Sequence, residues 1–407
     1  MWIRALVVLG IICGISLLMG GPYGASRSYS HLDSAALWHK WGDATLRLLK
    51  GDDLQDYFDF RHRRRRFNGV VYIAEKGTVL HQKAYGVANE RTRKALTMHS
   101  SFQLASLSKV FTATAVLLLY QEGKVDLEAP VSDYLKGWPY EKMKVRHLLH
   151  HRSGMARYMA VAAWHWKKPY TPMSNQDVLR QYIRHDPITF FRPGRNFNYC
   201  NTNYVILACL VEAVSGQSFR DFMEARIFSP LCMEDAMIYS RVDDPEIPNE
   251  AIGYKAGRRG YYRAPNDYID GVYGDKGMYA SMSDLVKFDA AIRDGSLLWP
   301  ETLEAAYTPG SKYRSRNYGL GWRLRTYKGA KLAYHFGWWR GFRTCYMRDL
   351  TADRTIIILS NRDHPGLNLS YWNVYNMLCK LDPELILDEA EAAAEKEETP
   401  QEEGNPT

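Results

Sequence analysis

Two stretches of apolar residues mark the predicted core of the chain. Residues 70–73 are Val, Val, Tyr and Ile, which favour a β-strand. Residues 75–77 have the composition of a turn and residues 79–85 form a second strand-like run, so a β-hairpin is predicted there. Residues 106–122 are apolar on nearly every side and are followed by Gly123, which predicts a helix that ends at this glycine. A helix without a polar face packs inside a protein, so we expect this helix to be central and buried.

Strand patterns return only towards the C-terminal end. Residues 130–300 are mostly helical segments broken by loops, and strand-like runs follow at 318–325, 331–335, 342–347 and 355–360. Strands at both ends with helices between them predict an α+β fold, because the two ends must pair in one antiparallel sheet that helices flank. The middle of the chain would add a helical lobe. A small-molecule site is then expected in the cleft between the lobe and the sheet.

The first 25 residues have the pattern of a leader. Met1–Arg4 is a short basic start, and Ala5–Gly20 is an apolar run of 16 residues, shorter than the roughly 20 residues of a spanning helix. This pattern predicts either a cleaved signal peptide or an uncleaved N-terminal anchor. We therefore expect an exported protein, periplasmic or extracellular, that is associated with the membrane through its N-terminus where the leader is retained.

The rest of the chain divides into three predicted parts. Residues 26–66 form a polar helical extension, residues 67–380 form the folded domain, and residues 381–407 form an acidic tail with the composition of disordered segments. The tail holds ten acidic residues and one lysine, so the remainder carries +17 although the whole chain carries +8. The densest basic run, residues 61–66, lacks aromatic interleaving and any nucleic-acid motif, so no nucleic-acid partner is predicted.

Composition excludes further classes of protein. The 407 residues are 46% apolar and 24% charged, an ordinary globular balance that excludes a disordered, collagen-like or polytopic membrane protein. The six cysteines contain no CxxC pair and no Cys/His cluster at zinc spacing, so no metal site is predicted. One disulfide is possible, but the sequence predicts no disulfide framework. The adjacent His150 and His151 lack carboxylates at metal-site spacing, which favours a structural role.

Ser106-Leu107-Ser108-Lys109 opens the predicted buried helix and carries the first candidate chemistry. A serine hydroxyl is a weak nucleophile until a neighbouring group accepts its proton. Lys109 lies three residues on, on the same helix face, and the helix start offers free N–H groups to a developing oxyanion. This spacing alone also fits an N-cap serine followed by an ordinary lysine.

Two later segments add candidates. Tyr199-Cys200-Asn201 offers a phenol that acts as a base only beside a cation, for which Lys109 is the candidate, and an amide that would hydrogen-bond a substrate carbonyl. His335-Phe336-Gly337 ends a predicted strand, and its glycine would let a substrate approach the backbone. The N–H groups of Trp338 and Ser106 would then form an oxyanion hole.

The three motifs SxxK, YxN and HxG, in this order and 93 and 136 residues apart, resemble those of serine β-lactamases and penicillin-binding proteins. The tyrosine motif resembles the branch that holds class C β-lactamases, D-alanyl-D-alanine carboxypeptidases and related esterases. Further similar segments are Phe102–Ala105, Glu122–Leu127 with Pro130-Val131, His147–Gly154, Asn201–Tyr204 and Tyr318–Trp322. The resemblance covers about residues 67–363.

The resemblance implies an acyl-enzyme mechanism without a metal or organic cofactor. Ser106 would be acylated, Lys109 and Tyr199 would transfer protons, and Asn201 would contact the amide of the acyl side chain. His335 would line the wall that faces a substrate carboxylate.

The third motif departs from the family pattern. Phe336 stands where β-lactamases have a threonine hydroxyl that helps to hold a carboxylate, and such a lost bond costs about 1.5–3 kcal/mol. We expect Phe336, with Trp338, to favour an apolar or aromatic substrate, and Arg340 to supply a carboxylate contact from a different angle.

The sequence therefore predicts an exported serine hydrolase of a small ester or amide, with cell-wall peptide among the candidate substrates and esterase chemistry slightly ahead of D-amino-acid peptidase chemistry. Two alternatives stay open: a catalytically silent binding module of the envelope with the same fold, and a true class C-like β-lactamase. The oligomeric state is not predicted.

Overall fold

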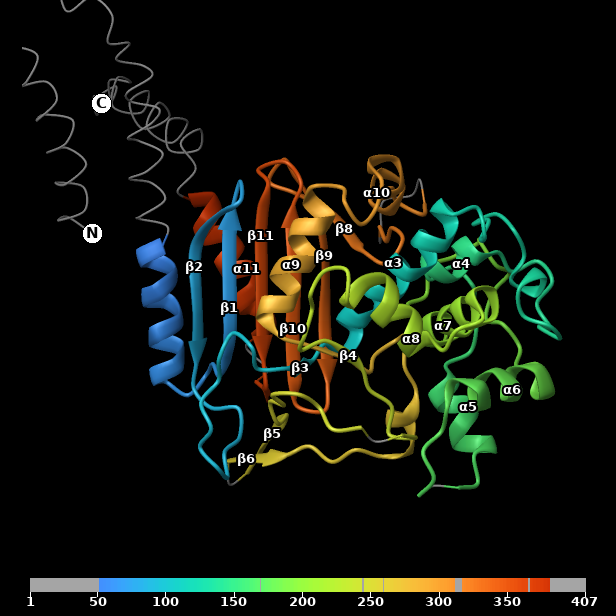
Figure 1. The fold of residues 1–407 in the computed structure, drawn as a ribbon, viewed down its shortest axis with the longest axis horizontal. Coiled ribbons are helices and arrows are strands. Elements are labelled where there is room, and N and C mark those ends of the chain that lie inside the picture. Colours follow the sequence, from blue (N-terminus) through green and yellow to red (C-terminus); the bar gives the residue numbers. More distant parts are fainter. Residues whose placement is uncertain are drawn as a thin grey trace, which may run out of the picture. The chain divides into compact units, whose positions relative to one another are not determined.

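The computed structural model describes residues 51–380 except 169, 244, 259, 312–316 and 365–366. Its centre is a six-stranded antiparallel sheet with the order β2-β1-β11-β10-β9-β8 (Figure 1). The strands are β1 (Gly69–Glu75), β2 (Thr78–Tyr85), β8 (Arg323–Tyr327), β9 (Ala330–Trp339), β10 (Phe342–Asp349) and β11 (Arg354–Ser360). The first and last strands of this sheet in chain order, β1 and β11, pair with each other. The prediction of an α+β fold with one sheet built from both chain ends is confirmed.

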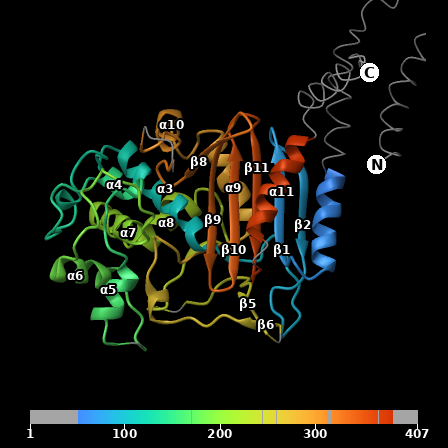
Figure 2. The same ribbon diagram turned by 180° about the vertical axis from the view of Figure 1, so that it is seen from behind.

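Helices lie on both faces of this sheet. The labelled α-helices are α3 (Ser108–Gln121), α4 (Val145–Leu149), α5 (Tyr158–His165), α6 (Asn175–His185), α7 (Thr202–Ser215), α8 (Phe219–Met223), α9 (Met282–Arg293), α10 (Pro300–Ala306) and α11 (Leu367–Lys380). Figure 1 shows α9 in front of the sheet and α4 to α7 gathered in a lobe beside it, and Figure 2 shows α11 crossing the opposite face. Residues 51–63 form a further helix next to β2.

Strand alternation creates two separate cores. In β1, Val70 and Tyr72 pack into the larger core with α3, whereas Val71 and Ile73 pack into the smaller core with α11. Successive side chains of a strand point to opposite faces, so a strand buried on both faces is apolar at every position. This explains why residues 70–73 are continuously apolar and why they identify a central strand.

Two small sheets connect the main elements. One has the order β12-β5-β6, with β12 (Arg362–Asp363), β5 (Tyr254–Gly257) and β6 (Gly260–Arg263). The other has the order β3-β7-β4, with β3 (Phe102–Gln103), β7 (Met278–Ala280) and β4 (Met237–Ile238). The second sheet matters for the site, because β3 leads directly into the segment that carries Ser106.

The predicted helix over residues 106–122 is present and buried, but it begins later than expected. A 3₁₀ turn, Ala105–Leu107, precedes α3, and the helix runs from Ser108 to Gln121. Ala105 has φ +52, a left-handed conformation that costs a non-glycine residue roughly 1–3 kcal/mol. This sharp turn places Ser106 just ahead of the regular helix.

The predicted strand over residues 318–325 is only partly correct, since β8 begins at Arg323. Gly319 and Gly321 form a tight turn instead: a Cβ on Gly319 would lie 2.0 Å from the carbonyl oxygen of Ala306, and Gly321 has φ +88. Glycines that permit close backbone approach break strands, so the apolar residues around them belong to a turn packed on α10.

The predicted leader, residues 26–50 of the predicted extension and the predicted acidic tail lie outside the described residues. Among the helices that the structure does describe, none combines the length and the hydrophobicity needed to cross a bilayer. The five cysteines in the described part, Cys200, Cys209, Cys232, Cys345 and Cys379, are free thiols.

Candidate functional site

Ser106 lies in the turn between β3 and α3. The N–H of Leu104 donates to the carbonyl oxygen of Met278 at 2.8 Å, and the N–H of Met278 donates to Ser108 Oγ at 3.3 Å. These bonds join the turn to β7 from both sides of Ser106. The serine is partly exposed while its neighbours Ala105 and Leu107 are buried, so its hydroxyl is presented at the surface of a fixed turn.

Lys109 is the group closest to the Ser106 hydroxyl. Its Nζ donates to Ser106 Oγ at 3.0 Å and to the backbone carbonyl of Asp275 at 2.6 Å, and the side chain is 0% exposed. Burial and these two hydrogen bonds fix the conformation of the Lys109 side chain, so that its amine is directed at the serine oxygen. The arrangement suits proton transfer between the two groups.

Tyr199 lies beside this pair. Lys109 Nζ is 5.2 Å from the centre of the Tyr199 ring. The guanidinium of Arg323, the first residue of β8, is 4.8 Å from the same ring centre. The ring of His151 packs on Tyr199 with centroids 4.2 Å apart. The side chains of Lys109 and Arg323 therefore both lie within cation–π range of the Tyr199 ring.

Asn201 follows at the start of α7. Its Oδ1 is buried and has no hydrogen-bond partner among the described residues. An unpaired buried amide oxygen is costly, and sites that bind ligands are where such groups occur. Asn201 thus keeps an acceptor available two residues after Tyr199.

The structure therefore brings Ser106 and Lys109 of the SxxK motif to Tyr199 of the YxN motif. The sequence matches the β-lactamase family over residues 54–376. The chain belongs to the β-lactamase family.

Members of the family with known activities are moderately similar. A penicillin-binding protein of Bacillus subtilis is 33% identical over 327 residues, which cover 77% of this chain and 72% of that protein. A D-aminopeptidase of Brucella anthropi is 32% identical over 288 residues, which cover 68% of this chain and 52% of that protein. The chain thus matches about half the length of the D-aminopeptidase.

Solved structures show the same fold. A penicillin-binding protein from Bacillus halodurans has a TM-score of 0.68 at 24% identity, with 77% of this chain and 97% of that chain covered. D-amino acid amidase from Ochrobactrum anthropi SV3, in complex with L-phenylalanine, has a TM-score of 0.63 at 24% identity, with 79% and 94% covered. The β-lactamase-type fold is confirmed on these grounds.

His335 occupies the third family motif, but it is not open to a substrate. It is 0% exposed, its Nε2 lies 3.0 Å from the Tyr318 hydroxyl, and its Nδ1 lies 2.9 Å from the carbonyl of Phe336. Nδ1 must carry the proton because a carbonyl only accepts, so Nε2 accepts from Tyr318. Burial, together with Arg323 and Lys109, holds the pKa of His335 well below its usual range. His335 is thus neutral and buried beside Tyr199, with ring centroids 6.2 Å apart, and its place on a carboxylate-facing wall stays a prediction.

Phe336 points away from the site, contrary to the prediction that its ring lines the substrate wall. Its ring stacks on Tyr371 of α11 with centroids 5.0 Å apart and lies 5.0 Å from that of Tyr334. Adjacent strand residues face opposite sides of a sheet, so His335 and Phe336 cannot both face Ser106. The aromatic replacement therefore fills the smaller core instead of selecting a substrate.

Arg340 is also placed differently from its predicted role. Its guanidinium is held by Asp267 at 2.7 Å and by Asp270 at 2.8 Å, and Trp339 Nε1 donates to Asp270 at 2.7 Å. These carboxylates raise the pKa of Arg340, which keeps the guanidinium protonated, and their negative charges balance its positive charge. A guanidinium already paired twice does not supply the predicted contact to a substrate carboxylate.

Gly337 and Trp338 border Ser106 through the backbone. A Cβ on Gly337 would lie 2.2 Å from the Leu104 carbonyl oxygen, so the glycine makes room for the turn that carries Ser106. The sequence predicted that this glycine would make room for the substrate instead. The Trp338 ring is 61% exposed and bonds Asp363 through Nε1 at 2.7 Å. β8 pairs with β9 only as far as Tyr334, so the Trp338 N–H lies beyond this pairing. The role of this N–H in an oxyanion hole stays a prediction.

Two further residues contact Tyr199: His151, for which the sequence predicted a structural role, and Arg323, for which it predicted none. His151 Nδ1 lies 3.1 Å from the Cys200 N–H and 3.1 Å from Asn203 Nδ2, which ties the YxN segment to α7. Burial keeps the pKa of His151 well below its usual range, so the ring is neutral. The family-like segment His147–Gly154 contains His151, and the family-like segment Tyr318–Trp322 ends one residue before Arg323, so both were visible signals.

Exchanging Phe336 for threonine, which restores the residue of the β-lactamase pattern, is expected to destabilise the protein by about 1–3 kcal/mol. The ring packs against Tyr371 and Tyr334, and threonine leaves that space empty. Because the side chain faces α11, penicillin acylation should remain within about threefold of wild type. Urea unfolding and acylation rates measure the two effects. A large gain in acylation would show that residue 336 does reach the site.

Proposed function

We propose that this protein is an exported serine hydrolase that opens an amide or ester bond of a small D-amino-acid derivative through an acyl-enzyme on Ser106. The observation that carries the proposal is the 3.0 Å contact between the buried Lys109 Nζ and Ser106 Oγ. Export is part of the proposal as well, and it is supported by the leader pattern of residues 1–25.

The reaction has two halves. In the first, Ser106 Oγ forms a bond to the carbonyl carbon while its proton passes to the Lys109–Tyr199 pair, and the same pair protonates the leaving amine or alcohol as its bond breaks. In the second, water forms a bond to the acyl carbon and gives up a proton to the pair, which returns a proton to Ser106 Oγ as the acyl–serine bond breaks and the acid leaves. The Ser106 and Trp338 N–H groups would hold the oxyanion in both halves.

Two features favour an amine-bearing or amide-bearing substrate over a penicillin. His335 is neutral and buried, so the third motif supplies no cation for the carboxylate of a β-lactam. The relatives at 30% identity or more include D-aminopeptidases, enzymes whose name denotes action on D-amino-acid residues. Esterase chemistry uses the same groups and stays inside the proposal, since an ester is the easier bond to break.

A substrate panel tests the proposal. The full chain is assayed with D-alanine and L-alanine p-nitroanilides, a short-chain p-nitrophenyl ester and a penicillin. We expect turnover of the D-anilide and of the ester, with the L-anilide and the penicillin much slower. Ser106→Ala should remove this turnover, whereas Ser296→Ala, which changes an exposed serine, should not.

Intact-protein mass spectrometry gives the second readout. After mixing with the ester, the wild type should gain the mass of one acyl group, and Ser106→Ala should gain none. Ligand binding without turnover or acylation would favour the silent binding module, and efficient penicillin hydrolysis would favour a true β-lactamase. Either result would replace the proposed function.

A further inference from the structure

Exposed large apolar side chains are concentrated in one stretch of the described chain. The four highest exposures belong to Tyr170 at 92%, Ile188 at 89%, Trp164 at 77% and Phe190 at 68%. Ile183, also in this stretch, is 37% exposed. Single exposed apolar residues are ordinary, but a group of them with polar surroundings marks a surface that contacts something apolar.

These residues belong to one structural unit, residues 157–195, which we call the lobe surface. The rings of His165 and His185 stack with centroids 3.8 Å apart, which joins the C-terminal ends of α5 and α6. Trp166 Nε1 donates to the Thr171 carbonyl at 3.2 Å and folds the intervening loop back. Figure 1 shows α5 and α6 side by side at the end of the helical lobe, away from the main sheet.

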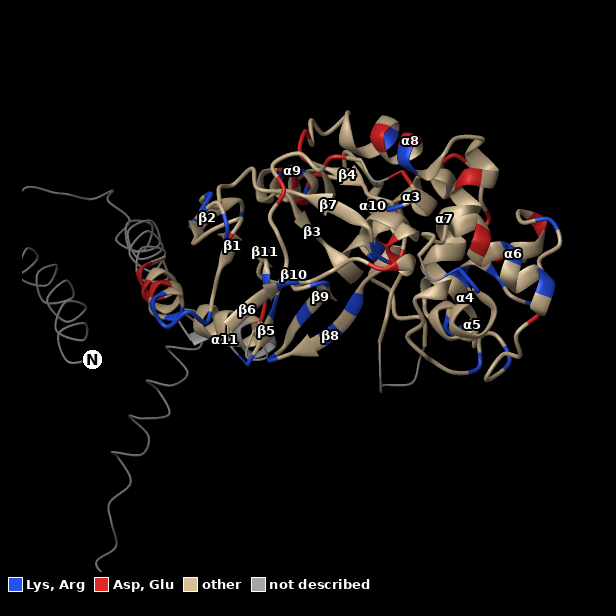
Figure 3. Cartoon of the chain, turned by 90° about the horizontal axis from the view of Figure 1, so that it is seen from below, with Lys and Arg blue, Asp and Glu red and all other residues tan. Residues whose placement is uncertain are grey.

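The lobe surface is strongly basic. It contains seven exposed cationic side chains and only two carboxylates, Asp177 and Asp186. The cations are Arg157, Lys167, Lys168, Arg180, Arg184, Arg192 and Arg195. Arg180 is neutralised by Asp177 at 2.5 Å. Figure 3 shows blue segments, which mark Lys and Arg, on α5, α6 and their loops.

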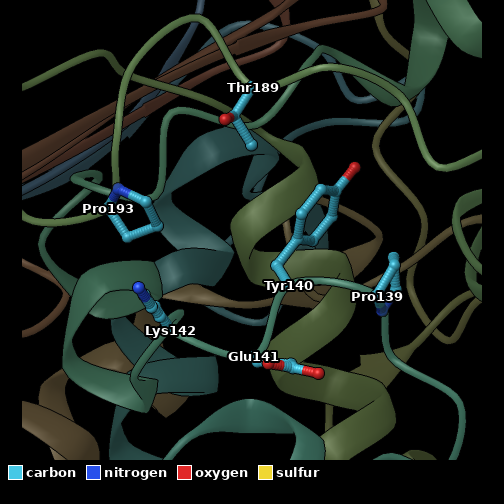
Figure 4. Close-up of a pocket in the computed structure, with 6 residues that line it drawn as sticks. All are labelled: Pro139, Tyr140, Glu141, Lys142, Thr189 and Pro193. Carbon is cyan, nitrogen blue, oxygen red and sulfur yellow. The ribbon is translucent and has the colours of Figure 1, made fainter.

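The segment with Ile188 and Phe190 is fixed to the body of the lobe beside a hollow. Tyr140 donates its hydroxyl to the Pro187 carbonyl at 2.5 Å, and the Phe190 N–H donates to the Gly154 carbonyl at 2.8 Å. A hollow of about 280 Å³ opens here, lined by Pro139, Tyr140, Glu141, Lys142, Thr189 and Pro193 (Figure 4). Ile188 and Phe190 flank Thr189 in the chain and are exposed even though their backbone is held.

We propose that the lobe surface seats this protein on an anionic lipid bilayer. Trp and Tyr side chains favour the membrane–water interface, and Lys and Arg beside them attract acidic headgroups. The proposal commits to a bilayer because seven exposed cations against two carboxylates match a continuous layer of acidic headgroups. The proposal does not depend on the chemistry at Ser106, and it concerns a different region from the predicted N-terminal anchor.

A fluorophore on the lobe tests the contact directly. Cys13 and Cys232 are replaced by serine, which leaves only buried thiols, and an environment-sensitive dye is attached after Ile188→Cys or, as control, after Tyr262→Cys. Tyr262 lies on β6 and is 52% exposed. With phosphatidylglycerol–phosphatidylcholine vesicles, the emission of the dye at residue 188 should shift to the blue, and that at residue 262 should not. Both proteins keep residues 1–50, so an N-terminal anchor acts equally in the two.

Charge variants give a second measurement. Changing Lys167, Lys168, Arg184 and Arg192 to glutamine should weaken flotation with the anionic vesicles about tenfold or more and leave hydrolysis unchanged. The matched control changes Arg91, Lys94, Arg258 and Arg263, four exposed cations elsewhere, and should bind as the wild type does.

Three results would overturn the proposal. They are an unchanged emission at residue 188, an equal shift at residue 262, and an emission at residue 188 that is already blue before vesicles are added. The last would mean that another segment of the chain or a second copy covers the surface, and its dependence on protein concentration would separate these two.

Discussion

Replacing Lys109 with methionine is expected to lower kcat/KM about a thousandfold, within the range that removal of a proton-transfer group produces. Methionine has a similar length and fills the same space without an amine, so Ser106 Oγ loses the neighbour that lies 3.0 Å away. The fall should appear in kcat more than in KM, because the amine is used in proton transfer rather than in substrate binding. Steady-state kinetics with the D-anilide and the ester measure this split.

Lys109→Arg separates proton transfer from simple charge. A guanidinium stays protonated under all assay conditions, so arginine keeps the positive charge beside Tyr199 but cannot accept the serine proton. We expect this variant to be as inactive as Lys109→Met, while Lys331→Met, at an exposed lysine of β9, stays fully active. Thermal unfolding checks that the variants fold, since the Asp275 carbonyl loses its donor in Lys109→Met. Activity of Lys109→Met within tenfold of wild type would remove Lys109 from the mechanism.

Local patterns were sufficient for the framework of this fold. The β-rich run at residues 70–73, the turn at 75–77 and the late strand-like runs each follow from side-chain alternation or turn chemistry, which are properties of neighbours in sequence. The SxxK spacing similarly places Ser106 and Lys109 on one side of a helix start. What they jointly contact, such as the Asp275 carbonyl 166 positions away, depends on the packing of distant segments.

The errors at the third motif have two different causes. The opposite directions of His335 and Phe336 follow from strand alternation and were available from the sequence, but the family motif was treated as if all its side chains faced the site. Arg340 was not open to such reasoning, because its partners Asp267 and Asp270 lie some 70 positions earlier and only the fold brings them together. The contact of Arg323 with Tyr199 is of the same kind.

Gly337→Ala is expected to lower kcat about a hundredfold, the effect of a displacement of about 1 Å in a catalytic group. The new Cβ would lie 2.2 Å from the Leu104 carbonyl oxygen, 2.2 Å from Thr344 Oγ1 and 3.1 Å from the Ala105 Cβ. Two of these atoms belong to the turn that presents Ser106, so β9 and the turn must move apart. The hydrogen bond from Thr344 Oγ1 to the Leu104 carbonyl, 2.8 Å long, is strained or broken at the same time. Overpacking of this kind also lowers stability by about 1–3 kcal/mol.

Gly329→Ala is the matched control for this substitution. Gly329 has φ +76 in the turn between β8 and β9, and a Cβ there meets nothing within 4 Å, so alanine should cost about 1 kcal/mol and leave kcat unchanged. The two variants are compared by urea unfolding and by turnover of the ester. Because both are Gly→Ala changes linked to β9, a loss of kcat confined to Gly337→Ala would come from the displaced serine turn rather than from weakened folding. Equal kcat in the two variants would show that β9 does not fix the position of Ser106.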